Sequence, residues 1–251
     1  MLKTVRTNLS HLRRSVLSLT LLGLAASMAN AAPLCVVDAT LQSYITSHNT
    51  FGNACQIGDK LFWGFDLQNG PLAIGTEPTA DDIKVLPIPG DGLTLIGISF
   101  NSGFWDVSNM LPLDQILSYN VATVTGQPII KDATLTIAGT LAGTGGTGTV
   151  VETLTPAVPG SPITVFLPST VSVNINFIGN MVSSLAVSNR ITLQGGPGFS
   201  DTAHISVIEN DFSENIVVPE PMTTVPLGAG LLFFGLAWRK RLARTANGSG
   251  K

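Results

Sequence analysis

The stretch Val171-Ser172-Val173-Asn174-Ile175-Asn176-Phe177 alternates apolar and polar residues at every step. A period of two places the apolar side chains on one face of a β-strand and the polar side chains on the other. This pattern predicts a strand with one buried and one solvated face, which is typical of antiparallel sheets.

Short segments rich in β-branched and aromatic residues lie on both sides of this stretch, separated by Gly or Pro. They are residues 61–67, 93–100, 121–124, 133–140, 148–154, 163–167, 185–193 and 204–208. Roughly nine to twelve short strands with turn signals between them favour an all-β fold. We expect an antiparallel β-sandwich with jelly-roll-like connectivity, and a β-bulge at Gly97.

The first 31 residues have the three parts of a secretory signal peptide. The positive n-region contains Lys3, Arg6, Arg13 and Arg14. The apolar h-region covers residues 16–26, and Ala29-Asn30-Ala31 supplies the small residues of the cleavage site. We therefore expect cleavage between Ala31 and Ala32. A retained N-terminal anchor is the alternative, which the short h-region disfavours.

Residues 218–244 combine a proline-bounded motif, an apolar run and a basic cluster. The motif is Val218-Pro219-Glu220-Pro221, the run covers 222–238 without a charge, and Arg239, Lys240, Arg241 and Arg244 follow. A helix over this run spans roughly 25 Å, just under the bilayer core. The cations hold its end in the cytoplasm. The run therefore predicts a transmembrane helix, with 245–251 as a tail.

This three-part tail resembles the sorting signal of PEP-CTERM proteins, which Gram-negative bacteria export and a membrane enzyme, exosortase, processes. Further segments are similar to a recurrent group of these proteins: Cys35 with residues 40–45, then 53–62, 132–139 and Asp211-Phe212-Ser213. The resemblance implies processing by signal peptidase and exosortase. It also implies an inner-membrane intermediate that ends at the cell surface or in the exopolysaccharide of a biofilm. A plain C-terminal anchor is the alternative. The group has no assigned activity.

The part between the two signals, residues 32–217, is expected to be a single exported domain, and it is strongly acidic. Its four basic residues, Lys60, Lys84, Lys131 and Arg190, stand against fifteen Asp and Glu, a net charge of −11. Nucleic acids and anionic membrane surfaces are bound by basic patches. The charge therefore argues against both as partners of this domain.

Cys35 and Cys55 are the two cysteines of the chain. In an exported protein, thiols oxidise, so we expect a disulfide between them, stabilising the fold by roughly 3 kcal/mol. Two free thiols are the alternative. The enclosed loop predicts a short helix over residues 39–47, with Asp38 as N-cap and Leu41, Tyr44 and Ile45 on one face. His48 continues that face and is expected to pack or cap.

The sequence has no recognised catalytic motif. It lacks Gly-x-Ser-x-Gly, His-Glu-x-x-His and EF-hand patterns, and we expect neither enzymatic activity nor a cofactor. His204 and Ser206 share a strand face, which does not orient a nucleophile. The alternative is a secreted carbohydrate-active hydrolase in which two of the carboxylates form an unrecognised site.

Two acidic groups are candidates for calcium, which prefers oxygen ligands in loops. They are Asp81-Asp82, and Glu209, Asp211 and Glu214 with Asn210 and Asn215. An acidic turn and a linker before Pro219 explain the same residues without a metal. We expect no metal site and keep calcium as the weaker alternative.

Two functions follow from these patterns. The first is a noncatalytic structural component of the surface or matrix that binds polysaccharide or other surface proteins; the second is the hydrolase. A sandwich fold serves either. Trp63 or Trp105 exposed on a sheet face would favour sugar binding, and burial of both would weaken it.

Overall fold

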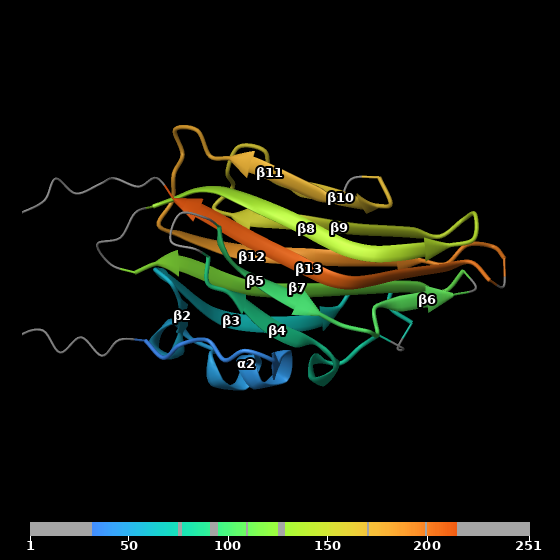
Figure 1. Ribbon diagram of the computed structural model, residues 1–251, viewed down its shortest axis with the longest axis horizontal. Helices are drawn as coiled ribbons and strands as arrows, with labels where there is room; N and C mark the ends of the chain where they lie inside the picture. The colour runs from blue at the N-terminus through green and yellow to red at the C-terminus, as the bar shows by residue number, and fades with distance from the viewer. Residues whose placement is uncertain are drawn as a thin grey trace, which may run out of the picture. The chain divides into compact units, whose positions relative to one another are not determined.

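The computed structural model describes residues 32–74, 77–90, 95–108, 110–124, 129–169, 171–198 and 200–214. These residues form thirteen strands in two antiparallel sheets that face one another, with one short α-helix at the edge (Figure 1). The predicted antiparallel sandwich is confirmed, whereas its jelly-roll connectivity stays a prediction. The predicted signal peptide, sorting motif, membrane helix, basic cluster and tail lie outside the described residues. No helix among the described residues has the length and apolar character needed to cross a bilayer.

Sheet A has the strand order β10-β9-β12-β7-β3-β2. The bounds are β2 Cys55–Ile57, β3 Lys60–Asn69, β7 Pro112–Thr123, β9 Thr147–Thr155, β10 Ile163–Leu167 and β12 Ser184–Gln194. Its centre is the pair β7 and β12, which remain in register from Pro112↔Gln194 to Ala122↔Ser184. Residues on its outer face therefore line up across four strands.

Sheet B has the order β1-β4-β5-β13-β8-β11, and β6 also pairs with β13. The bounds are β1 Ala39–Thr40, β4 Lys84–Ile88, β5 Ile96–Asn101, β6 Asp106–Ser108, β8 Ile130–Ala142, β11 Ser172–Asn176 and β13 Thr202–Glu214. The alternating stretch at 171–177 forms β11, with Val173 and Ile175 packed towards the core. The sequence pattern therefore gave the correct inward face of this strand.

Aromatic side chains join the inner faces of the two sheets. Phe62 and Tyr119 of sheet A meet Phe212 and Phe100 of sheet B, with ring centroids 6.5 Å apart for Phe62–Phe212 and 5.7 Å for Phe100–Tyr119. All four side chains are buried. Aromatic pairs of this kind add about 0.5–1.5 kcal/mol beyond the burial of their area. The space between the sheets is thus one continuous core.

The helix α2 (Leu41–Ser47) lies at the edge of the sandwich, against β3, β1 and the short 3-10 helix η2 (Ala80–Asp82). Tyr44 packs edge-on against Phe65 of β3, with ring centroids 5.0 Å apart. Its Oη donates to the backbone oxygen of Val36 at 2.7 Å. Burial raises the pKa of the Tyr44 hydroxyl. The helix therefore covers the end of the core with its apolar face.

The predicted disulfide is confirmed, because Cys35 and Cys55 are bonded and their Cα atoms lie 4.8 Å apart. The predicted cap is wrong: Thr40 caps α2 through its Oγ1, which accepts from Ser43 N, whereas Asp38 lies before β1 with a φ of 59°. The prediction for His48 is confirmed. Its backbone N–H bonds to Tyr44 O, and its Nδ1 lies 2.7 Å from Asn53 O.

The last strand, β13, extends to Glu214, well beyond the predicted end at 208. Asn210 points into the core, where it donates to Glu152 of β9 and accepts from Asn189 of β12 at 2.7 Å. Burial raises the pKa of Glu152 to about 8, although the hydrogen bond from Asn210 lowers it. The expected acidic linker is therefore wrong for residues 209–214, which belong to a central strand.

The bulge lies in β3 and not at Gly97. The register between β3 and β7 shifts between Trp63 and Asp66, and Gly64 there has a φ of 67°. Gly97 pairs regularly with Asp211, and a Cβ on Gly97 would lie 2.2 Å from Asp211 Oδ1. Gly97 thus makes room for a neighbouring side chain.

Candidate functional site

The outer face of sheet A carries two rows of side chains that run across its strands. Residues paired between neighbouring strands lie on the same face. The rows follow from the registers: Thr155, Ala186, Asn120 and Trp63 in one, Thr153, Ser188, Ser118 and Asp66 in the next. The second row is polar throughout and ends in a carboxylate.

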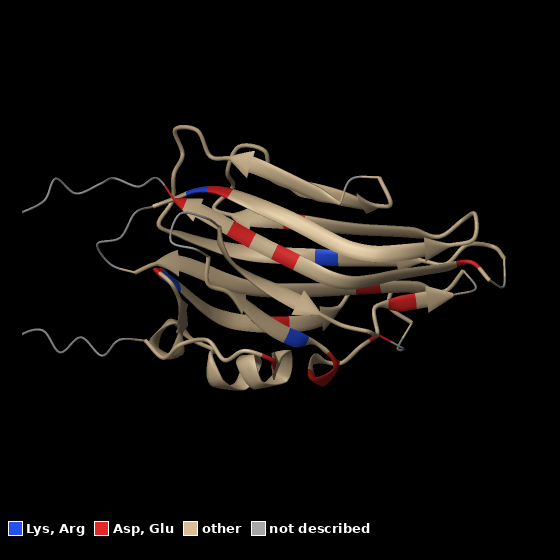
Figure 2. Ribbon diagram, in the orientation of Figure 1, with Lys and Arg blue, Asp and Glu red and all other residues tan. Residues whose placement is uncertain are grey.

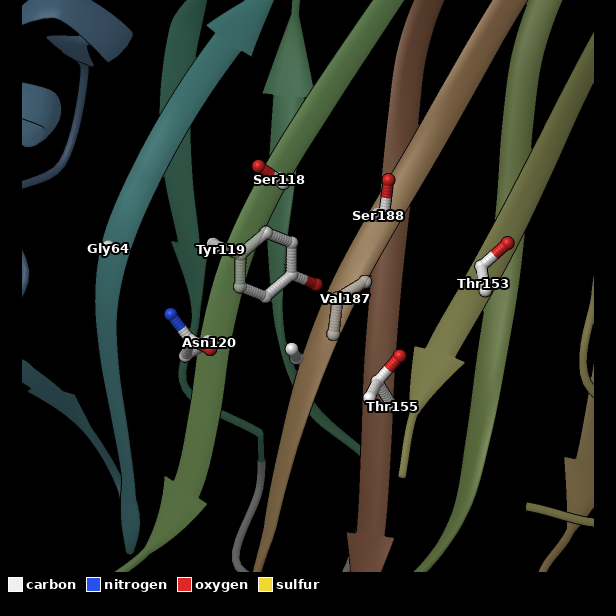
Figure 3. A pocket seen from close by; sticks show the side chains of 9 residues that line it. Gly64, Ser118, Tyr119, Asn120, Thr153, Thr155, Val187 and Ser188 are labelled. Carbon is white, nitrogen blue, oxygen red and sulfur yellow. The ribbon is translucent and has the colours of Figure 1, made fainter. Parts of the chain in front are cut away.

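Six residues of these rows, all except Trp63 and Asp66, line a shallow hollow of about 160 Å³ (Figure 3). Its lining includes Ser118, Asn120, Thr153, Thr155 and Ser188, contributed by β7, β9 and β12. Figure 3 shows the hydroxyl groups of these strands standing on the sheet around an open space. In the described part of the chain no hydrogen bond engages the four Ser and Thr hydroxyls. They remain available to water or to a ligand. We call this hollow the groove.

An aromatic pair stands at the β3 end of the groove. Trp63 is partly exposed and lies opposite Asn120, and its ring meets that of Phe51 edge-on with centroids 5.0 Å apart. Phe51 is 60% exposed. The groove therefore combines a polar floor with an apolar ring at one end. Trp105, in contrast, is fully buried, and its Nε1 donates to Gln115 Oε1 at 2.8 Å.

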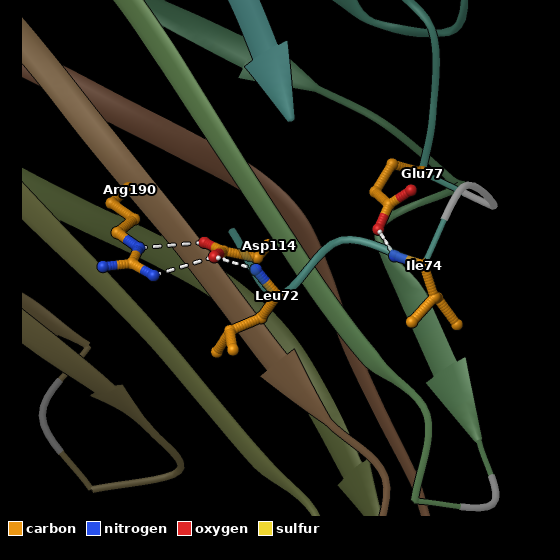
Figure 4. A network of polar contacts seen from close by, with 5 residues as sticks. All are labelled: Leu72, Ile74, Glu77, Asp114 and Arg190. Atoms are coloured by element: carbon orange, nitrogen blue, oxygen red, sulfur yellow. Dashed lines mark hydrogen bonds and ion pairs between the residues drawn. The ribbon is translucent and has the colours of Figure 1, made fainter. Parts of the chain in front are cut away.

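An ion pair lies on the same face further along β7 and β12. Arg190 Nε and Nη2 donate to Asp114 Oδ1 and Oδ2 at 2.9 and 2.8 Å (Figure 4). The hydrogen bonds from Arg190 hold the pKa of Asp114 below its usual value, against the opposing effect of burial. Asp114 Oδ2 also accepts from Leu72 N at 3.1 Å. The pair thus fixes the segment that follows β3 onto the outer face.

A second hollow, of about 370 Å³, lies at the edge of β3. We call it the cleft. It is lined from three sides, by α2, by β3 and by the segment before η2: Gln42, Ile45, Asp66, Leu67, Asn69, Glu77, Pro78, Thr79 and Ala80. Asp66 belongs to the cleft and also ends the polar row of the groove, because it pairs with Ser118. Groove and cleft are therefore adjacent.

The wall of the cleft is fixed by hydrogen bonds. Gln115 Nε2, in the core, donates to Pro78 O at 2.7 Å. Thr79 and Asp82 form a capping box, in which Asp82 Oδ2 accepts from Thr79 N at 2.8 Å and from Thr79 Oγ1 at 2.7 Å. These bonds lower the pKa of Asp82. Asp82 thus caps η2.

Glu209 and Asp211, two of the three acidic calcium candidates on β13, lie on the outer face of sheet B. Figure 2 shows acidic positions along β13. Glu209 and Asp211 alternate with the inward Asn210 and so face outward. Burial raises the pKa of Asp211, and a hydrogen bond with Glu209 and its charge raise it further. The two side chains therefore lie within hydrogen-bond reach of each other.

Glu214, the third of these residues, ends β13. The expected loop location of the three residues is wrong, because they stand on a strand. No group of three or more His, Cys, Asp or Glu suited to a metal occurs among the described residues.

His204 and Ser206 are each bound to a backbone oxygen. His204 Nδ1 lies 3.0 Å from Trp105 O, and Ser206 Oγ donates to Ala138 O at 3.2 Å. Their hydrogen bonds therefore run to two different segments, one just before β6 and one in β8.

The groove itself was not predicted from the sequence. Its residues come from four strands that are distant in the chain, and β7, which supplies Ser118 and Asn120, was predicted only over 121–124. The one available signal was Trp63, proposed as a test of sugar binding.

No family model matches the chain, and no curated protein matches it. Solved structures with some likeness include TmCBM61 in complex with beta-1,4-galactotriose, at 13% identity over 60% of this chain and 88% of that chain, with a TM-score of 0.31. Endoglucanase 3 of family GH12 from Trichoderma harzianum has 12% identity over 60% of this chain and 98% of that chain, with a TM-score of 0.18. A mutant of CBM29-2, a family 29 carbohydrate-binding module, has 12% identity over 63% of this chain and 99% of that chain, with a TM-score of 0.15. Likeness at this level carries no argument about function, which we derive from the groove.

Proposed function

We propose that this protein is a noncatalytic component of the cell surface or extracellular matrix that binds a polysaccharide through the groove. The observation that carries the proposal is the set of unengaged hydroxyls, Ser118, Ser188, Thr153 and Thr155, in one hollow beside Trp63. A sugar offers hydroxyls to the floor and an apolar C–H face to an aromatic ring. The groove offers the matching groups: donors and acceptors on the sheet and a ring at its end.

The shape of the groove suits a chain that lies across the strands. Neighbouring strands are about 4.8 Å apart, so the row from Thr153 to Asp66 covers roughly 14 Å. That length takes several sugar units in line. The hollow is open and shallow, which suits a polymer bound along its length better than a small molecule enclosed on all sides.

The hydrolase alternative receives no support from the carboxyl groups whose pKa is raised. Glycosidases place two carboxyl groups about 5 to 9 Å apart, with the glycosidic bond between them. Asp211 and Glu209 share a hydrogen bond, which leaves no space for a substrate between them. Glu152 lies in the core, out of reach of a polymer.

Filling the groove tests the binding proposal. The full chain and its Ser188→Arg variant are applied to a glycan array, with Ser172→Arg as the matched control on the outer face of sheet B. We expect the chain and the control to bind the same glycans, and the Ser188→Arg variant to bind none of them. Equal binding by both variants would rule out the groove.

We further propose that the termini direct the protein to the surface through signal peptidase and exosortase. The support is the signal-like composition of residues 1–31 and the motif at 218–221 before an apolar run. In a host with exosortase, we expect Glu220→Ala to leave an uncut precursor in the inner membrane. Normal processing of that variant would contradict the role of exosortase. An exported protein that begins at Met1 would contradict cleavage by signal peptidase.

A further inference from the structure

We propose that the cleft beside Asp66 binds an amino sugar, so that groove and cleft together select a glycan with free amines. The inference rests on the proposed binding of polysaccharide in the groove and specifies its chemical class. It follows from the position of the cleft, its charge and its fixed walls.

The cleft lies where the pairing of β3 with β2 ends. β2 pairs with β3 only from Lys60 to Phe62, and beyond Trp63 no described strand continues along this edge. The bulge at Gly64 lies at the same place. Helix α2 and the segment 77–80 face the open edge instead of a strand. A glycan that follows the polar row across the strands therefore reaches the cleft directly after β3.

The charge of the cleft is negative. Asp66 and Glu77 belong to its lining, and the lining contains no Lys or Arg. Asp81 and Asp82 follow in η2. The one described cation on the outer face of sheet A, Arg190, is paired with Asp114. Lys84, exposed at the start of β4, is not part of the lining. A primary amine on a sugar is positively charged once it is protonated, at mildly acidic pH, and is then attracted to this site, whereas a uronic acid is repelled.

The remaining lining residues suit the body of a sugar. Gln42, Asn69 and Thr79 provide amide and hydroxyl groups, and Ile45 and Leu67 provide apolar surface for the ring. The volume of about 370 Å³ is within the range of small-molecule sites. The cleft can therefore hold the end or one unit of a chain whose other units lie in the groove.

The walls are held in place before any ligand binds. Gln115 fixes Pro78, the capping box fixes Thr79, and Ile74 N donates to Glu77 Oε1 at 2.7 Å (Figure 4). On the other side, the Cys35–Cys55 disulfide closes the loop that carries α2. Preorganised groups lose little conformational freedom on binding, which favours affinity and selectivity.

The test compares two ligands that differ only in the amine. Titration calorimetry of the full chain uses a glucosamine pentamer and the same pentamer after N-acetylation. We expect the free amine form to bind about tenfold more tightly, with a preference that weakens as salt is added. The variants Glu77→Gln and Asp66→Asn should reduce the preference, and Asp106→Asn, an exposed acid on β6, should retain it.

A second variant guards against local damage to the wall. Gln42→Lys introduces a cation from the exposed side of α2 and should weaken binding of the amine form more than binding of the acetylated form, because only the amine is repelled by the added charge. Equal affinity of the full chain for both pentamers, or an unchanged preference in Gln42→Lys and Glu77→Gln, would overturn the amine site and leave the groove standing. Binding of neither pentamer would count against groove and cleft together.

Discussion

The two outer faces of the sandwich both carry rows of polar side chains, but these side chains are used differently. On sheet B, the hydroxyls of Thr136 and Ser172 lie 2.8 Å apart, and Asn174 donates to Thr134 at 2.7 Å. On sheet A, the described hydroxyls of the groove have no such partners. A hydroxyl bonded to its neighbour contributes to the sheet, while an unengaged one remains available to a ligand. Polar composition alone therefore does not mark a binding face.

The largest expected effect is a loss of stability when a side chain is added to the tightly packed outer face of sheet B. A Cβ on Gly97 would lie 2.2 Å from Asp211 Oδ1 and 2.3 Å from the backbone oxygen of Asn210. Because backbone cannot move aside, Gly97→Ala should destabilise the protein by about 3 to 4 kcal/mol. On sheet A, a Cβ on Gly64 meets only the side chain of Asn120, with Nδ2 at 2.5 Å. Gly64→Ala should therefore cost about 1 kcal/mol, mainly for its positive φ.

Urea denaturation of the two variants measures this difference. Similar losses of stability in Gly97→Ala and Gly64→Ala would show that the two faces are equally tolerant and would remove the packing half of the comparison.

The next effect is a dependence of stability on pH that originates on β13 and in the core. The pKa of Asp211 is raised by burial and by Glu209, and burial raises that of Glu152 to about 8. Each group keeps its proton in the native state at pH values where the unfolded chain has released it. Stability is therefore greatest below about pH 4 for these groups and falls as pH rises towards 8, by up to about 1.4 kcal/mol per pH unit for each group.

Asp211→Asn and Glu152→Gln should each flatten this dependence, which denaturation midpoints at pH 5, 6.5 and 8 report. The exposed Asp106→Asn is the matched control. A slope that persists in the double variant Asp211→Asn/Glu152→Gln would assign it to other groups.

A smaller effect is expected for the aromatic end of the groove. Trp63→Ala removes the ring beside Asn120 and should weaken glycan binding about tenfold, or about 1.4 kcal/mol. Phe166→Ala is the control, because Phe166 is also an exposed aromatic residue, on β10 of the same sheet. If both variants bind equally well, the apolar contribution does not come from Trp63.

The smallest expected effect is the change in glycan affinity when a single hydroxyl is removed from either outer face. Ser188→Ala should lower affinity about threefold, since one hydrogen bond to a ligand is worth about 0.7 kcal/mol. Ser172→Ala should leave affinity unchanged and lower stability slightly, because Ser172 bonds to Thr136. The reverse outcome, with affinity lost in Ser172→Ala, would place the ligand on sheet B.

Those parts of the fold that depend on local pattern could be predicted from the sequence. The strand Ile163–Leu167 was predicted with the observed bounds, the helix near the N-terminus followed from residue spacing, and the disulfide followed from the expectation of export. Strands β7 and β13 were mostly missed. They contain Asp114, Gln115 and Asn210, residues of low strand propensity that are buried here because distant partners satisfy them.

The groove and the cleft could not be predicted for a related reason. Ser118 and Ser188 become neighbours only through the register of β7 with β12, and Asp66 joins them only after the bulge in β3 shifts its pairing. A bulge of one residue changes which side chains face the solvent. Sequence spacing around Gly64 indicates a turn or bulge at most, and the identity of the facing strand is a property of the whole sheet.

The central position of β13 has a mechanical consequence. This strand is the last described one, and it lies between β5 and β8, with Val207 to Phe212 paired to β5. A pull on the chain beyond Glu214 would run along the strand and load the hydrogen bonds on both sides at once, in shear. Bonds that must break together resist force far better than bonds opened one by one. A domain held by its C-terminal end in a sheared matrix would thus transmit tension through sheet B.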